Sequence, residues 1–173
     1  MARPLFESFE AVPRWRPRRL HRITLSIAIL SLLAAAQSPL PLVPDDALSP
    51  GATNTGNMDQ VCAPNYSRQI RQVSVSMRRA VYAEYGLTAA SCGHCEIDHR
   101  IPLEIGGSNE KSNLWPQSDD TKPWNAHSKD RLEDYIHERV CKGDMPLAEA
   151  QQLFRGNWID AYEKVFHVDA PKN

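Results

Sequence analysis

A turn sequence between two short apolar runs constrains the fold of this chain more than any other feature. Residues 106–109 read Gly-Gly-Ser-Asn, a composition that strongly favours a turn. The preceding run, residues 95–103, predicts a short strand that Pro102 confines to a sheet edge or a strand end. Residues 113–115 predict the returning strand, which ends before Pro116. The sequence therefore predicts a β-hairpin in the middle of the chain.

Helical periodicity lies on both sides of this hairpin. Apolar residues recur at helical spacing over residues 67–85, and Gly86 follows them as a stop. After the hairpin, Asn125 is a suitable N-cap for a helix that runs to about Val140. Residues 144–165 predict a last amphipathic helix. The order helix, hairpin, helix, helix predicts an α+β domain with the hairpin packed between N-terminal and C-terminal helices.

The N-terminus has the pattern of an export signal. An arginine-rich segment precedes the uncharged residues 23–36, which end in three alanines. This run is 14 residues long, which is short for a helix that spans a bilayer. We therefore predict that residues 1–36 are a signal peptide and that the protein is periplasmic or secreted, with no stable membrane association after cleavage. The alternative is an inner-membrane anchor formed by residues 23–36.

Composition divides the remaining chain into a tether and a domain. Residues 37–60 are rich in Pro, Ser, Gly, Asn and Asp and lack apolar periodicity, so we expect a flexible tether. Residues 61–170 are left for the folded domain. Residues 1–36 hold six of the 20 lysines and arginines but only two of the 21 acidic residues, so the rest has a net charge of −5. Such an acidic body is not typical of a general nucleic-acid coat, and a nucleic-acid role would need a local site.

The hairpin carries groups suited to phosphodiester hydrolysis. Asp98 and His99 are adjacent near the end of the predicted first strand, and they offer a metal-binding carboxylate and a base. Because successive strand side chains point to opposite faces, both serve one site only if the strand ends or twists there. Asn113 can hold the His99 ring through its side-chain carbonyl. His127, in the first turn of the next helix, can be a second metal ligand.

This pattern resembles that of the HNH endonucleases, the ββα-metal or His-Me finger nucleases. The shared elements are, in order, Asp98-His99, Pro102, Gly106-Gly107, Asn113-Leu114 and His127 with Lys129. The resemblance covers about residues 96–129. More loosely, residues 61–66 and 125–162 resemble small exported bacterial proteins of the HNH type.

The resemblance implies a ββα-metal hairpin-helix and a role for each matching residue. His99 would be the general base, and Asn113 would orient it. Asp98 and His127 would bind one divalent metal ion, and the residues alone do not decide between Mg, Mn, Zn and Ni. The implied function is a metal-dependent endonuclease that cleaves DNA, or RNA, with little sequence selectivity.

Several basic residues are candidates for contact with the nucleic acid. The resemblance implies that Lys129 binds a phosphate. Arg78 and Arg79 lie on the polar face of the helix predicted over residues 67–85, where they are either simply solvated or part of a phosphate-binding strip. The sequence does not indicate an oligomeric state.

Four cysteines add a second class of function. In an oxidising compartment they allow three disulfide pairings, and Cys62 and Cys141 flank the domain in positions suited to join its first segment to the central helix. Cys92 and Cys95 form a Cys-x-x-Cys motif that also imitates a redox centre or half of a zinc site. The alternative function is therefore a non-catalytic binding module with an HNH-like fold, stabilised by zinc or by disulfides. A thiol–disulfide oxidoreductase is disfavoured, because no βαβ pattern surrounds the motif.

Overall fold

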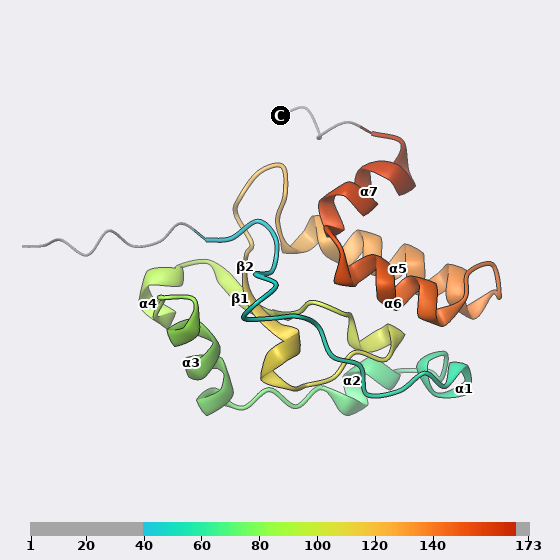
Figure 1. The fold of residues 1–173 in the computed structure, drawn as a ribbon, viewed down its shortest axis with the longest axis horizontal. Coiled ribbons are helices and arrows are strands. Elements are labelled where there is room, and N and C mark those ends of the chain that lie inside the picture. Colours follow the sequence, from blue (N-terminus) through green and yellow to red (C-terminus); the bar gives the residue numbers. More distant parts are fainter. Residues whose placement is uncertain (1–39, 169–173) are drawn as a thin grey trace, which may run out of the picture. The chain divides into compact units, whose positions relative to one another are not determined.

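The computed structural model describes residues 40–168, so the predicted signal peptide lies outside the described residues. This part of the chain combines helices with one two-stranded antiparallel sheet, which confirms the α+β class. In chain order the elements are α1 (Met58–Val61), α2 (Tyr66–Ile70), α3 (Val75–Glu84), α4 (Ala89–Cys92), β1 (Cys95–His99), the 3₁₀ turns η1 (Leu103–Ile105) and η2 (Lys111–Asn113), β2 (Leu114–Ser118), α5 (Ala126–Cys141), α6 (Leu147–Arg155) and α7 (Trp158–Phe166) (Figure 1). Within residues 40–168, every helix is too short or too polar to cross a membrane.

The predicted hairpin is present, with a shorter first strand and a longer second strand than predicted. Strand β1 ends at His99, so the apolar residues that follow it belong to a loop and to η1. Strand β2 continues through Pro116, which lies opposite Ile97. A proline is tolerated there because each strand of a two-stranded sheet has a free edge, where no backbone N–H is required.

The hairpin separates two hydrophobic cores. In Figure 1, α3 and α4 lie on one side of the hairpin, and α5, α6 and α7 lie on the other. What we call the small core consists of Val81, Tyr82, Leu87, Cys92, Ile97 and Leu114. The large core consists of Val61, Ile101, Ile105, Trp115, Trp124, Leu132, Ile136, Val140, Leu147, Ala150, Phe154, Trp158 and Tyr162. Because side chains alternate along a strand, the neighbours Leu114 and Trp115 belong to different cores.

Helix boundaries follow capping residues more closely than apolar periodicity. The helix predicted over residues 67–85 is two helices, because Ser74 accepts a hydrogen bond from the Met77 N–H (3.1 Å) and starts α3 anew. The last predicted helix is likewise divided, since Asn157 caps α7 after α6 has ended at Gly156. The start of α5 after its N-cap Asn125 is confirmed.

Residues 40–60 do not form the expected tether. They run beside the hairpin and bond to it through their backbone, with Gly51 N–H donating to the Ser112 carbonyl at 2.8 Å. The buried Ser49 hydroxyl donates to the Leu114 carbonyl at 2.6 Å. These contacts are made by backbone and small polar groups, so the absence of apolar periodicity does not reveal them.

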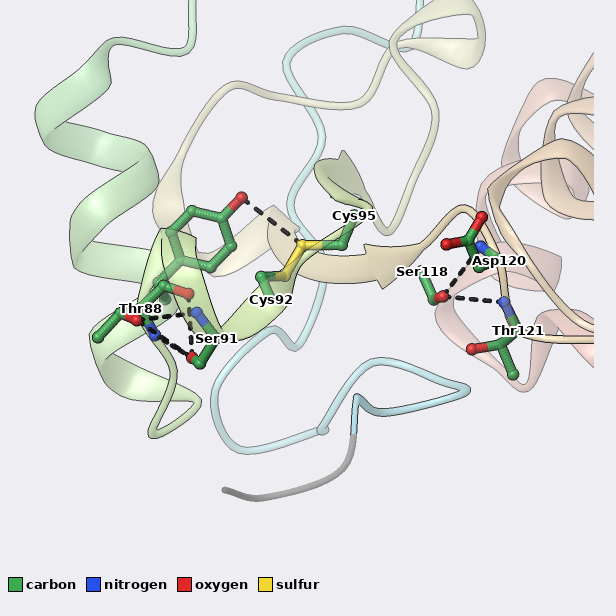
Figure 2. Close-up of a disulfide and its surroundings, with 8 residues drawn as sticks. Thr88, Ser91, Cys92, Cys95, Ser118, Asp120 and Thr121 are labelled. Atoms are coloured by element: carbon green, nitrogen blue, oxygen red, sulfur yellow. Dashed lines mark hydrogen bonds between the residues drawn. A yellow bond between two sulfur atoms is a disulfide. The ribbon is translucent and has the colours of Figure 1, made fainter. Parts of the chain in front are cut away.

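Each core has its own disulfide. Cys62–Cys141 joins the end of α1 to the end of α5, with 5.6 Å between the Cα atoms, and encloses 79 positions of sequence. Cys92–Cys95 joins α4 to the start of β1 and closes a separation of only three (Figure 2). The Tyr82 hydroxyl lies 3.7 Å from the Cys95 sulfur. The long-range disulfide therefore connects distant segments, and the short one stiffens a local turn.

Candidate functional site

His99 is the last residue of β1, and one of its two ring nitrogens has no hydrogen-bond partner within residues 40–168. The residue is only 1% exposed. Its Nε2 lies 3.1 Å from the side-chain oxygen of Asn109, whereas Nδ1 is buried without a hydrogen bond. Nδ1 is one of six buried side-chain polar atoms without a partner among the described residues, and it is the one that belongs to an imidazole. Because such an atom is costly in free energy, it is a functional candidate.

Hydrogen bonds determine which nitrogen of His99 carries the proton. The Asn109 amide donates to the Ile70 carbonyl (2.7 Å), and its oxygen accepts from the Gln72 N–H (3.1 Å). This pair of bonds fixes the orientation of the amide, so its oxygen must also accept from Nε2–H of His99. The neutral ring therefore has a free lone pair on the buried Nδ1.

The surroundings of His99 keep its ring neutral. Burial lowers the pKa of His99 to about 4, against the opposing effect of the neighbouring Asp98 carboxylate. The positive charges of Arg71 and Lys129 contribute to this lowering of the pKa. At neutral pH the imidazole is therefore unprotonated at Nδ1, the state required of a general base.

Asn109, which the sequence marks only as a turn residue, connects His99 to a segment far away in the chain. Its amide binds the backbone of Ile70 and of Gln72, the residues on either side of Arg71. This clamp holds the linker between α2 and α3 over His99. The exposed Arg71 is thereby placed within electrostatic range of both His99 and Glu96. The turn motif predicted the backbone bend, but this pairing depends on tertiary contact.

Asn113 occupies a different position from the predicted one. It is fully buried, and its side-chain oxygen accepts from the Ile101 N–H at 2.9 Å. Its amide nitrogen donates to the carbonyls of Ile101 and Ser108, both at 2.9 Å. These bonds use the side chain to close the loop after β1, so Asn109 rather than Asn113 holds the His99 ring. The same loop requires Gly107, where a Cβ would lie 1.8 Å from the Ile101 carbonyl oxygen.

Lys129 is a buried structural cation and not an exposed phosphate ligand. Its ammonium donates to the Asp98 carboxylate at 2.6 Å, to the His99 carbonyl at 2.8 Å, and to Glu133. These three bonds use all its donor hydrogens, and the residue is 1% exposed. Burial lowers the pKa of Lys129, but Asp98 and Glu133 outweigh this effect, and the pKa is raised overall. The charged ammonium thus anchors the backbone of His99 to α5.

The donors predicted for a divalent metal do not form a ready site. The Asp98 carboxylate has Lys129 as its cation, and His127 is exposed in the first turn of α5. Among residues 40–168, the one group of three His, Cys, Asp or Glu with mutually close ligand atoms is Cys62, His137 and Cys141, which contains neither residue. Within the described residues, Asp98 and His127 therefore belong to no three-ligand cluster, and the two-ligand metal site stays a prediction.

Two further features surround the site. Burial raises the pKa of Glu96, two residues before Asp98, to about 7, and the charges of Asp98 and Asp130 act in the same direction. Arg78 and Arg79 are exposed on α3 and make no ion pair within residues 40–168. Glu96 therefore titrates near neutrality, and the two arginines are available to an anionic partner.

Comparison with known proteins does not assign a family. No family model matches the chain, and neither the curated proteins nor the solved structures include a significant match. The arrangement around His99 must therefore be interpreted from its own geometry.

Proposed function

We propose that this protein is a nuclease that hydrolyses phosphodiester bonds, with DNA as its substrate and His99 as the general base. The observation that carries the proposal is the lone pair on Nδ1 of His99, which has no partner, is kept unprotonated by burial and is aligned by Asn109. A structural histidine in a core normally has both nitrogens satisfied, so this arrangement favours a reactive role.

In this proposal, Nδ1 removes a proton from a water molecule that attacks the phosphorus. An oxygen–phosphorus bond forms as the bond to the 3′ oxygen breaks. The proton of the attacking water moves to the imidazole, and the departing 3′ oxygen takes a proton from solvent. Lys129 and Asn109 hold His99 from two directions, through its carbonyl and through Nε2. Because Nδ1 is buried, the reaction requires a local opening that admits a water molecule to it.

Arg71 is the cation best placed to bind the scissile phosphate in this proposal. The clamp on its neighbours Ile70 and Gln72 places it beside His99. Arg78 and Arg79 extend the exposed positive charge along α3, on a body that is otherwise acidic. Phosphate contacts of this kind position a nucleic acid without selecting its sequence, which agrees with the low selectivity we expect.

The metal requirement implied by the resemblance is a separate part of the hypothesis. Since Asp98 already has a buried cation, we assign no step of the reaction to a metal. Activity measured after EDTA treatment, and after separate addition of Mg²⁺, Mn²⁺, Zn²⁺ and Ni²⁺, tests this requirement. His127→Ala shows whether that side chain takes part in any metal effect.

A plasmid-nicking assay on the full chain tests the proposal. His99→Ala should lower the rate of nicking by about 10²–10⁴-fold, the usual contribution of a general base. His94→Ala is the matched control, because His94 is exposed and lies before β1, and it should leave the rate unchanged. Activity of His99→Ala within about tenfold of the wild type would overturn the assignment.

The same assay separates the nuclease from a binding module. RNA is tested in parallel with plasmid DNA, and cleavage of RNA alone would correct the substrate. Retardation of DNA in a gel without cleavage, under all metal conditions, would contradict the proposal and favour the non-catalytic module.

A further inference from the structure

Cys62, His137 and Cys141 form a second cluster of reactive side chains, remote from His99 in the sequence. Their ligand atoms all lie within 4.8 Å of one another. His137 and Cys141 are four positions apart on α5, a spacing that places both on one helix face. Cys62 reaches the same point from the end of α1. The cluster therefore combines two sulfurs and an imidazole, the ligand types that Zn²⁺ prefers.

The distances in this cluster are close to those of a tetrahedral zinc site. With Zn–S of about 2.3 Å and Zn–N of about 2.0–2.1 Å, the sulfur–nitrogen edge of the tetrahedron is about 3.6 Å and the sulfur–sulfur edge about 3.8 Å. The His137 Nε2 already lies 3.4 Å from the Cys141 sulfur. In a disulfide the two sulfurs are about 2 Å apart. Breaking the disulfide therefore needs to separate the sulfurs by only about 2 Å to complete the geometry.

We propose that the thiol form of Cys62 and Cys141 binds one Zn²⁺ together with His137, and that this zinc site and the disulfide replace each other. A dithiol reduces the disulfide, becoming oxidised itself, and leaves two thiols. Zn²⁺ then displaces both thiol protons to solvent and takes the lone pair of Nε2. The fourth position is open to water, because Cys141 is exposed.

His137 is positioned for this exchange by one backbone contact. In the disulfide form, its Nε2 lies 2.9 Å from the Val61 carbonyl, next to Cys62. Coordination moves the ring proton to Nδ1 and replaces that hydrogen bond with a bond to the metal. Either form holds α1 against α5 and so keeps the long loop between them closed.

The other cysteine pair provides an internal control. Cys92 and Cys95 also form a disulfide, but they belong to no group of three close ligands within residues 40–168. The nearby His94 is exposed and pairs with Asp120 at 3.0 Å. Two sulfurs without a third protein ligand bind zinc weakly, so this pair should contribute little.

Titration of the reduced full chain with Co²⁺, a spectroscopic substitute for Zn²⁺, tests the proposal. We expect the visible absorption of tetrahedral Co²⁺ at one equivalent per chain, its loss on addition of Zn²⁺, and no signal from the oxidised protein. Cys92→Ser with Cys95→Ser should retain the signal, and Cys62→Ser with Cys141→Ser should abolish it. His137→Ala, which keeps both cysteines and their disulfide, should weaken binding by about tenfold or more.

Three results would overturn the proposal. One is the absence of stoichiometric Co²⁺ binding by the reduced wild type. Another is an unchanged Co²⁺ affinity in His137→Ala, whose fold is verified by circular dichroism. The third is a signal that follows Cys92 and Cys95 instead of Cys62 and Cys141.

Discussion

Asp98 and His99 are adjacent on β1 and face opposite sides of the β1–β2 hairpin, and they differ in how completely their polar groups are satisfied. On the large-core side, Asp98 pairs with Lys129, whose three donor hydrogens are all used. On the other side, His99 has one bonded nitrogen and one without a partner. Because side chains alternate along a strand, these two adjacent residues face opposite sides of the hairpin, and only Asp98 meets a charged partner there. The comparison supports our proposal that His99 is the reactive group, with Asp98 in a structural role.

The largest difference should appear when the two disulfides are removed in turn. In the chain-entropy model, Cys62–Cys141 stabilises the fold by about 4–5 kcal/mol, because it closes a loop of 79 positions. We expect Cys62→Ser with Cys141→Ser to lower the free energy of unfolding by about this amount in urea. The loss in Cys92→Ser with Cys95→Ser should be much smaller, since that loop spans three positions. Equal losses would contradict the division into a long-range and a local disulfide.

Removing the buried cation should have the next largest effect. Lys129→Met leaves Asp98 and Glu133 buried without their positive partner, which costs about 3–5 kcal/mol of unfolding free energy. Lys142→Met is a matched control, because Lys142 pairs with Glu138 at the same helical spacing but on the surface. Denaturant unfolding should show no measurable change for this control. A stable Lys129→Met protein would show that the large-core side is not held together by this cluster.

Acid should destabilise the protein through His99. Its pKa is about 4 in the folded protein and about 6.5 when unfolded, so between these values the unfolded chain binds the additional proton. Stability attributable to His99 is therefore present above pH 6.5 and is lost as the pH falls toward 4, by about 3 kcal/mol in total. The difference between the wild type and His99→Asn, measured by urea unfolding at pH 7 and pH 4, isolates this contribution. If the difference does not depend on pH, His99 is not buried in its neutral form.

The smallest effect expected is that of Asn109→Ala. Loss of this side chain removes the partner of Nε2 and the clamp on the linker, and should cost about 1 kcal/mol of stability. The rate of nicking should fall by about twofold or more, because the ring then samples both neutral tautomers and loses its fixed orientation. Asn113→Ala is the comparison variant: it opens the loop after β1, so the loss of stability should be larger. An unchanged rate in Asn109→Ala, with the fold intact, would remove Asn109 from the site.

Local signals were reliable where the interactions that they describe are local. The turn at residues 106–109 and the Asn125 cap can both be identified from the sequence. The helix breaks at Ser74 and Asn157 were missed, since a capping side chain inside an amphipathic stripe does not interrupt its periodicity. At both positions the sequence is compatible with one continuous amphipathic helix or with two helices separated by a cap, and packing decides between them.

The candidate site likewise contains one residue that the sequence motif identifies and others whose roles depend on tertiary contacts. His99 could be identified as the base from its place in the motif, and that assignment remains a proposal. Asn109 could not be identified as its partner, because the contact needs the α2–α3 linker, which is 37 to 39 positions away in the chain. The resemblance predicts that Lys129 binds a phosphate, a role that requires an accessible ammonium. Only the packing of α5 against β1, 31 positions away, makes this lysine a buried counter-ion.

By itself, the sequence determined the α+β class, the central hairpin and the start of α5, because turns and caps are decided by residues within a few positions of one another. Tertiary structure decided which polar groups are satisfied, because their partners come from distant segments. It paired Asp98 with Lys129 and left Nδ1 of His99 free. The free energy of a buried polar group depends on its partners in space, and its own position in the sequence does not specify them.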